Sequence, residues 1–345
     1  MAKYNVGGQA VIEGVMMRSP HSFSVAVRTP DKKILVRESP WESLWDRIRF
    51  LKWPFLRGSV VLLETLWNGI SALNFSAMHA IPDEESEGQK NEPMSKTAIT
   101  LTIIFAVGFG LALFVALPHF LTWLIGKASG TDLNVKSFSF HAIDGLIKIV
   151  IFVLYLWLIA MLPDIRRTFM YHGAEHKSIF AYENGAELTV ENARSFSAKH
   201  PRCGTSFILI VLLLSIFIFA VVFPFVPSLV SNQVLNNIIY VFIKIALIFP
   251  IGGISYEILK LSGKYRDNAM VRALSYPGLV MQKLTTREPT DDQLEVALVS
   301  LRKTLWRESV RDSKPRTSSM EIVESFISFE DFVSKYPGPC DAEQP

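Results

Sequence analysis

Two histidines and a glutamate lie close together in the sequence YHGAEHK of residues 171–177. Residues i and i+4 share one face of a helix, so the imidazoles of His172 and His176 can reach the same metal ion. Glu175 lies beside them and has the chemistry of a general base. The order H-x-x-E-H is the one that inverted zinc peptidases use. The segment therefore predicts a metal centre with Glu175 as its catalytic group, and the competing interpretation is a solvated helix with two surface histidines.

Further potential ligands follow in the sequence HPRCGTS of residues 200–206. An imidazole and a thiolate together suit Zn²⁺ better than Mg²⁺ or Ca²⁺, and iron or manganese in an open site stays an alternative. Four protein ligands would make a closed structural site, whereas three ligands and a water would make a catalytic one, and the sequence leaves both open. The predicted ligands of this divalent transition metal are His172, His176, His200 and Cys203.

The same short segment allows two other interpretations. Cys203 could be a nucleophile with His200 as its base, because the positive end of a following helix lowers the pKa of a thiol. The two histidines of the preceding motif would then lack a role. The start of that helix also predicts a site for a phosphate or a carboxylate, since its backbone N–H groups can bind an anion, although plain helix capping explains the same residues. The residues of this predicted anion site are Arg202, Gly204, Thr205 and Ser206.

Two acidic residues near the expected membrane surface are weaker candidates for the same pocket. Glu13 stands between small residues near the N-terminus, and Glu257 follows Tyr256 at the end of the last apolar run. Ionisable groups at membrane depth often serve a function. Capping or snorkelling explains both residues as well, so we rank them behind Glu175.

Four long apolar runs must position these groups. Half of the 345 residues are hydrophobic and the mean hydropathy is +0.28. The 35 Lys and Arg against 32 Asp and Glu give a net charge of +3, which excludes a nucleic-acid-binding protein held by bulk charge. An apolar run of about 20 residues crosses a bilayer as a helix, and a soluble bundle would leave the missing polar faces unexplained. The sequence therefore predicts a mainly α polytopic membrane protein, with spans near residues 97–125, 143–162, 205–223 and 234–255.

The distribution of lysine and arginine predicts the orientation of these spans. Basic residues are frequent before the first run, between the second and third runs, and after the fourth, whereas the other two connections are poor in them. Such basic segments stay on the cytoplasmic side of a membrane. We therefore expect a multi-pass protein of the inner, or plasma, membrane with both termini in the cytoplasm. The loop 163–204 would then hold the metal centre at the cytoplasmic surface.

The parts outside the membrane core at 97–255 should form small cytoplasmic units. Alternating apolar residues around a turn predict a β-unit over residues 1–38, and a cap followed by an amphipathic pattern predicts interfacial helices over 39–81. Residues 82–96 have the acidic composition of a solvated linker. After the last span, a threonine cap predicts helices over 256–306, and polar composition predicts a loosely ordered tail over 307–345.

Four segments in combination resemble the YqhQ-like family of bacterial membrane proteins. They are GGQAVIEGVMMR at residues 7–18, YHGAEHK at 171–177, HPRCGTSF at 200–207 and LTTREP at 284–289. The likeness covers nearly the whole chain, although the extension after Trp306 departs from the usual length. This family has a domain of unknown function and is catalogued as predicted metal-dependent enzymes. The resemblance implies an integral membrane protein, supports metal binding by the motif histidines and implies no substrate.

We expect a metal-dependent enzyme of hydrolase type that acts at the cytoplasmic membrane surface on a lipid-linked or membrane-protein substrate. The alternative is a nonenzymatic membrane scaffold with a structural metal, which docks a cytoplasmic protein partner. A transporter is a third class, suggested by charged residues near the spans, but no inverted repeat or pair of broken helices supports it. The charged residues in question are Asp144, Lys148 and Lys244.

Overall fold

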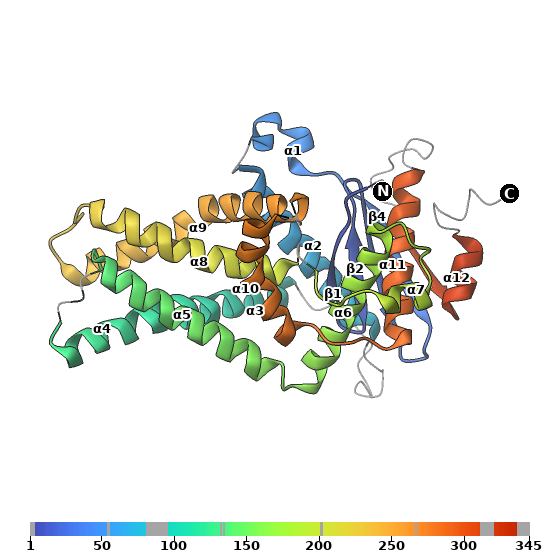
Figure 1. Ribbon diagram of the computed structural model, residues 1–345, viewed down its shortest axis with the longest axis horizontal. Coiled ribbons are helices and arrows are strands. Elements are labelled where there is room, and N and C mark those ends of the chain that lie inside the picture. The colour runs from blue at the N-terminus through green and yellow to red at the C-terminus, as the bar shows by residue number, and fades with distance from the viewer. Residues whose placement is uncertain are drawn as a thin grey trace.

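The computed structural model has an antiparallel sheet with its covering helices at one end and a bundle of apolar helices at the other (Figure 1). It describes residues 4–53, 56–80, 96–131, 133, 135–200, 203–265, 268–310 and 321–336.

Five strands form the sheet, in the order β1-β2-β3-β4-β5. The first four follow one another along the chain, and Glu13 and Lys32 adopt positive φ angles of 51° and 64° in two of the turns between them. The last strand comes from the C-terminal part and pairs with β4, with Ile34 opposite Phe326. The strands are β1 (Gly7–Val11), β2 (Gly14–Arg18), β3 (Ser22–Arg28), β4 (Ile34–Pro40) and β5 (Ile322–Phe326).

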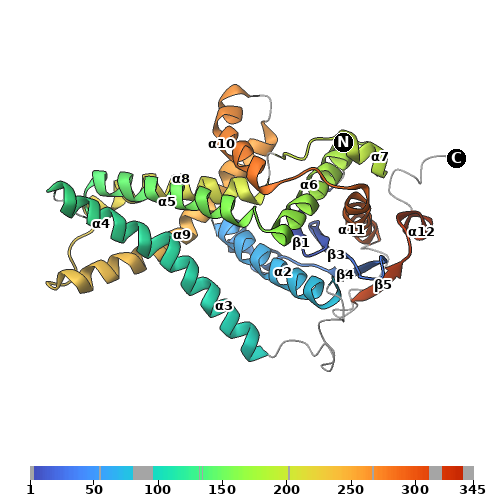
Figure 2. The ribbon, with the colours of Figure 1, turned by 90° about the horizontal axis from the view of Figure 1, so that it is seen from below.

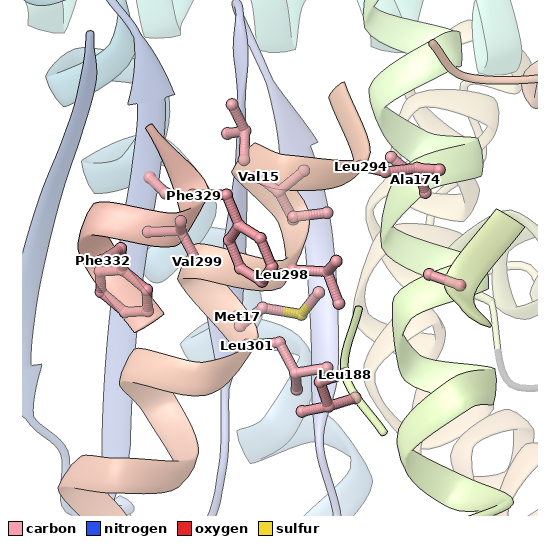
Figure 3. Close-up of a cluster of buried hydrophobic side chains, with 14 of the residues drawn as sticks. Val15, Met17, Ala174, Leu188, Leu294, Leu298, Val299, Leu301, Phe329 and Phe332 are labelled. Atoms are coloured by element: carbon pink, nitrogen blue, oxygen red, sulfur yellow. The ribbon is translucent and has the colours of Figure 1, made fainter. Parts of the chain in front are cut away.

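Helices cover both faces of the sheet, because apolar side chains alternate between the two faces. On β2, Val15 and Met17 belong to the core beneath helix α11 (Asp291–Ser309), whereas Met16 belongs to the core beneath helix α2 (Leu56–Ala80). Figure 2 shows the sheet between these two helices. The predicted threonine cap of α11 is present as a capping box between Thr290 and Gln293. Figure 3 shows Leu294, Leu298 and Leu301 of α11 in the cluster with Val15 and Met17 of β2.

Helix α2 lies between the sheet and the apolar bundle. Its polar residue Glu64 is buried and accepts hydrogen bonds from Arg18 at 2.7 Å and from Ser43 at 2.6 Å. On the other side, a Cβ atom on Gly58 would lie 2.7 Å from the Cβ atom of Tyr256, so α2 packs closely on helix α9. The helices long and apolar enough to cross a membrane do not include α2.

Among the described residues, four helices are long and apolar enough to cross a membrane, which confirms the predicted mainly α fold class. These stretches are Thr100–Ser129, Phe138–Ile159, Gly204–Phe225 and Leu235–Leu261. In the most apolar 18 residues of the first stretch, no residue is buried within the protein, so the side chains there face its surroundings. The bundle contains α3 (Lys96–Leu111), the π-helical η3 (Ala112–Ala116), α4 (Leu117–Ser129), α5 (Phe138–Ile159), α8 (Gly204–Val222), η4 (Phe223–Phe225) and α9 (Gln233–Lys264).

The segment predicted as a loop over 163–204 is mostly helical. Helix α6 begins at Pro163. Proline is favourable at this position because it has no N–H, and the first N–H of a helix would have no partner within the helix. A second, short helix follows before α8, and helix α10 returns to the start of α8 after the bundle. The remaining elements are α1 (Leu44–Arg47), η1 (Arg49–Lys52), α6 (Pro163–Glu183), α7 (Val190–Ser195), α10 (Ala269–Thr285) and α12 (Phe329–Lys335).

The tail predicted to be loosely ordered over 307–345 contains folded structure in its described part. Half-buried and exposed residues alternate along strand β5, and Phe326 at its end is buried against the ring of Phe332 on α12, with ring centroids 5.0 Å apart. The prediction missed this strand because its apolar and polar residues do not alternate in sequence: Val323 is exposed, whereas Glu324 lies on the half-buried side. Residues 311–320 and 337–345 lie outside the described residues, as does the predicted acidic linker apart from Lys96.

Candidate metal centre

Helix α6 and the start of helix α8 bring three potential metal ligands together. His172 and His176 share one face of α6, and their ring centroids are 4.4 Å apart. Cys203 is the N-cap residue of α8, and its Sγ lies 3.2 Å from His172 Nε2. One ligand atom from each of the three residues lies within 4.8 Å of the other two. The arrangement has the compactness that a single metal ion requires.

The backbone orients both imidazoles. His172 Nδ1 lies 2.8 Å from the carbonyl oxygen of Thr285, and His176 Nδ1 lies 2.6 Å from that of Ala198. A carbonyl oxygen only accepts hydrogen bonds, so each Nδ1 carries the proton and each Nε2 keeps a free lone pair. Within the described part of the chain, the buried Nε2 of His176 has no hydrogen-bond partner. Metal-binding histidines have this arrangement of a fixed Nδ1 and a free Nε2.

Glu175 is buried beside the two imidazoles. Its Oε2 lies 3.9 Å from His172 Nε2 and 4.0 Å from His176 Nε2. Burial raises the pKa of the Glu175 carboxyl, whereas the imidazoles of His172 and His200 and the backbone of Gly8 oppose this shift. Burial likewise lowers the pKa of His176 and favours the neutral imidazole that a metal binds. The carboxylate is therefore close enough to act together with the three ligands.

Two glycines allow the chain to close around the centre. A Cβ atom on Gly8 of β1 would lie 2.7 Å from Glu175 Cγ, so only glycine lets the strand approach this side chain. A Cβ atom on Gly173 would overlap with the carbonyl oxygen of Arg287. The N–H of Arg287 donates to the carbonyl oxygen of Phe169 at 2.9 Å, which holds the segment after α10 against α6. This contact is what places the Thr285 carbonyl against His172.

His200 lies next to the three ligands but faces another partner. Its Nε2 is 3.3 Å from Glu183 Oε2, and its ring packs against Phe180 with centroids 4.4 Å apart. Its backbone N–H donates to Gln282 Oε1 and its carbonyl accepts from Gln282 Nε2, both at 2.8 Å. The sequence predicted four ligands, and the structure brings three of them together without His200.

Two of the four predicted anion-binding residues, Thr205 and Ser206, contact other side chains at the start of α8. Thr205 Oγ1 lies 3.1 Å from Cys203 Sγ. Ser206 is buried, and its Oγ accepts a hydrogen bond from Gln282 Nε2 at 3.1 Å. A Cβ atom on Gly278 would lie 2.5 Å from the same Oγ, so α10 packs closely on the start of α8. Gly204 is exposed at the first position of the helix. The remaining predicted anion-binding residue is Arg202, which lies outside the described residues.

The two second-rank acids each pair with an arginine. Arg167 donates to both carboxylate oxygens of Glu13, and the Tyr171 hydroxyl donates to Glu13 Oε2 at 3.1 Å. Arg57 donates to both oxygens of Glu257 at 2.5 Å. These pairs tie β1–β2 to α6 and α2 to α9, and neither acid belongs to the group of three ligands.

Sequence comparisons place the chain among proteins without an assigned activity. The pattern of a family described as "Protein of unknown function (DUF1385)" matches residues 53–307, about three quarters of the chain. The chain belongs to this family. It is also 35% identical to "Uncharacterized protein YqhQ" of Bacillus subtilis (strain 168) over 329 residues, which cover 92% of this chain and 99% of that protein. No solved structure matches. The resemblance inferred from the four segments is thereby confirmed.

Three of those segments meet at the centre of this DUF1385 protein. The first supplies Gly8, the second supplies His172, Glu175 and His176, and the third supplies Cys203. The fourth segment begins with Leu284 and contributes the carbonyl oxygen of Thr285. Backbone carbonyls leave no mark in a sequence, so their roles were missed. The glycines at close approaches did leave a signal, since glycine inside a strand or helix indicates a tight contact.

If Cys203 is a nucleophile in this DUF1385 protein, its base is not His200, as the sequence suggested, but His172. His172 Nε2 lies 3.2 Å from Cys203 Sγ and His176 is also close to it, whereas His200 is not part of this group. The Thr285 carbonyl fixes the His172 tautomer with its free Nε2 toward the sulfur. This geometry suits a shared metal ion and a thiol–imidazole pair alike, so metal content is the property that separates them.

Proposed function

We propose that the chain is a metal-dependent membrane enzyme of hydrolase type. The observation that carries this proposal is the orientation of two imidazoles by the carbonyl oxygens of Thr285 and Ala198, which leaves both Nε2 atoms toward Cys203 Sγ. Two imidazoles and one thiolate form a ligand set that Zn²⁺ fits best among common divalent ions. A metal ion held there would supply a Lewis acid.

The role assigned to Glu175 is that of general base. Its Oε2 lies 3.9 Å and 4.0 Å from the two histidine Nε2 atoms, and the group formed by His172, His176 and Cys203 does not include it, which supports a role beside the metal rather than as a ligand. From there it can accept a proton from a water that approaches the open side of the ligand set. Because His200 is engaged with Glu183, three protein ligands surround the position, as in catalytic zinc sites.

The proposed location is the cytoplasmic surface of the inner membrane. The C-terminal end of α5 leads directly into α6, and Cys203 stands at the start of α8, so the centre lies where two apolar helices end. The basic residues of the segments around α6 favour the cytoplasmic side. A substrate that reaches this position from the bilayer would be lipid-linked or a membrane protein, attacked at a carbonyl or phosphoryl group.

The first experiment measures metal content. Full-length protein, purified in detergent without chelators, should contain about one transition-metal ion per chain by elemental analysis. His172→Ala and His176→Ala should each lose it. His79→Ala is the control, because His79 lies on α2, outside the group of three ligands, with its Nδ1 2.8 Å from the carbonyl oxygen of Phe75 in its own helix. Metal-free wild-type protein would refute the proposal.

One observation favours the scaffold with a structural metal and a cytoplasmic protein partner. His176 and Cys203 are only 2% and 5% exposed, and structural zinc sites are closed in this way. Cobalt substitution separates the two functions. An open position should bind added azide and change the visible spectrum of the cobalt protein, whereas a closed position should not. Glu175→Gln should abolish hydrolysis with unchanged metal content in an enzyme, and should be tolerated by a scaffold.

A further inference from the structure

A second group of ionisable side chains lies inside the apolar bundle, far from the three ligands. Asp144 and Lys148 stand on the first half of α5, whose other end leads into α6, and Lys244 stands on α9. Lys148 Nζ donates to Asp144 Oδ2 at 2.6 Å, and Lys244 Nζ lies 4.0 Å from the same oxygen. The three residues are 2% to 7% exposed. One carboxylate therefore serves two ammonium groups.

Each lysine has neighbours that attract a positive charge. The short bond to Asp144 is a charge-assisted hydrogen bond of Lys148. Lys244 Nζ lies 5.3 to 5.7 Å from the centroids of three aromatic rings, and such rings attract a cation. Two positive charges and one negative charge leave a surplus of one positive charge. The rings are those of Phe140, Phe219 and Phe223.

Two histidines face the same group. His141 is 1% exposed, and among the described residues neither of its ring nitrogens has a hydrogen-bond partner. His119 on α4 and His141 on α5 both interact electrostatically with Asp144 and with both lysines. Lys244 likewise makes no hydrogen bond to any residue that the structure describes, whereas the spare acceptors are Asp144 Oδ1 and one nitrogen of His141. Spare donors therefore outnumber spare acceptors.

We propose that this cluster binds one small monovalent anion, of which chloride is the simplest. A surplus charge in an apolar bundle is costly unless a counter-charge is present, and no second carboxylate is paired with either lysine among the residues described. A bound anion accepts hydrogen bonds from Lys244, Lys148 and His141 and brings the net charge to zero. Because α5 supplies Lys148 and α9 supplies Lys244, the anion also joins these two helices.

The test uses the full-length protein in detergent with sodium chloride or sodium gluconate at equal ionic strength. Equilibrium dialysis with radioactive chloride should give one saturable site per chain, and chloride should raise the unfolding temperature over the same concentration range. Lys244→Met removes the surplus charge, so it should abolish chloride binding and the chloride-dependent rise. Asp144→Asn increases the surplus, so it should bind chloride more tightly. These opposite changes distinguish an anion site from general destabilisation.

Two further variants complete the experiment. Lys148→Met leaves Lys244 to balance Asp144, so it should also lose chloride binding. It replaces Lys244→Met as the test variant if that variant does not fold. Lys127→Met removes an exposed lysine at the end of α4 and should behave as wild type. Absence of saturable chloride binding by wild type would overturn the proposal, as would binding that survives in both lysine variants. A stability that depends on pH but not on chloride would assign the balance to proton loss from a lysine and would overturn it equally.

Discussion

Gly8 on strand β1 lies directly against the side chain of Glu175 on helix α6. A Cβ atom on Gly8 would lie 2.7 Å from Glu175 Cγ and 2.8 Å from the carbonyl oxygen of Met16. One of these neighbours is backbone within the sheet, which cannot move without disturbing β2. The N-terminal sheet therefore sets the position of the carboxylate in the candidate metal centre, and the glycine-rich segment 7–18 has a physical reason to accompany the histidine motif.

Gly8→Ala should disturb this position. Overpacking of this kind costs about 1–3 kcal/mol of unfolding free energy, and we expect Glu175 to move while the metal content stays unchanged, since no ligand is touched. Chemical unfolding and elemental analysis measure the two effects. Gly7→Ala is the matched control, because nothing lies within 4 Å of its added Cβ atom. Equal unfolding free energies for the two variants would show that the close approach has no energetic consequence.

Gly173→Ala should weaken metal binding without replacing a ligand. The added Cβ atom would overlap with the Arg287 carbonyl and push the segment after α10 away from α6, so His172 would lose the Thr285 carbonyl that orients it. Loss of such an orienting group lowers metal affinity about 10–100-fold. Competition with a chelator of known affinity measures this change. Gly108→Ala, in open space on α3, should bind metal as wild type does, and an unchanged affinity of the Gly173 variant would contradict the role of the Thr285 carbonyl.

The sequence was sufficient to predict that the two candidate ligands on α6 share a face, but not which other residue joins them. The i, i+4 spacing is a local property of a helix, so it fixes the common face of His172 and His176 before any tertiary contact forms. The direction of the His200 ring depends instead on Glu183, two turns beyond the motif, and on the anchoring of its backbone by Gln282. Those contacts join the connection between α7 and α8 to helices α6 and α10, and spacing along the chain contains no information about them.

The same distinction between local and distant contacts explains the fold. A membrane span must satisfy all its backbone hydrogen bonds within itself, which makes its apolar run visible in sequence. Strand β5 instead depends on a partner almost the whole chain away, with Ile322 opposite Glu38. For α2, the polar residues did indicate an unusual helix. Its position between sheet and bundle follows from the contacts of Glu64 and Gly58, which no local pattern predicts.

The C-terminal unit of β5 and α12 should loosen in acid. Burial raises the pKa of Glu324, but two neighbours lower it by a larger amount, so the pKa lies below 4.5. They are the Tyr336 hydroxyl, which donates to the two carboxylate oxygens at 2.5 and 2.6 Å, and the ammonium group of Lys303. A lowered pKa in the folded state stabilises that state above about pH 4.5, and this contribution is lost as the pH falls through the lower folded value.

Amide hydrogen exchange in β5 measures this loosening. Protection should fall in wild type below about pH 4.5 once the intrinsic pH dependence of exchange is removed, because protonated Glu324 loses its charge. Glu324→Gln should show reduced protection already at neutral pH and little further change in acid. Glu330→Gln, an exposed acid on α12, is the control and should follow wild type. Identical profiles for wild type and the Glu324 variant would exclude this carboxylate as the cause.

His200→Gln distinguishes the observed ligand set from the four-ligand set that the sequence suggested. Because His200 Nε2 faces Glu183 and lies outside the group of three ligands, we expect the variant to retain about one metal ion per chain. His172→Gln, the matched change on α6, should lose it, together with the charge-transfer absorption of a cobalt–thiolate bond in cobalt-substituted protein. Glu183→Gln should resemble His200→Gln, since it breaks the same contact from the other side. Loss of metal in His200→Gln with normal folding by circular dichroism would make His200 a fourth ligand and would favour the structural site over the catalytic one.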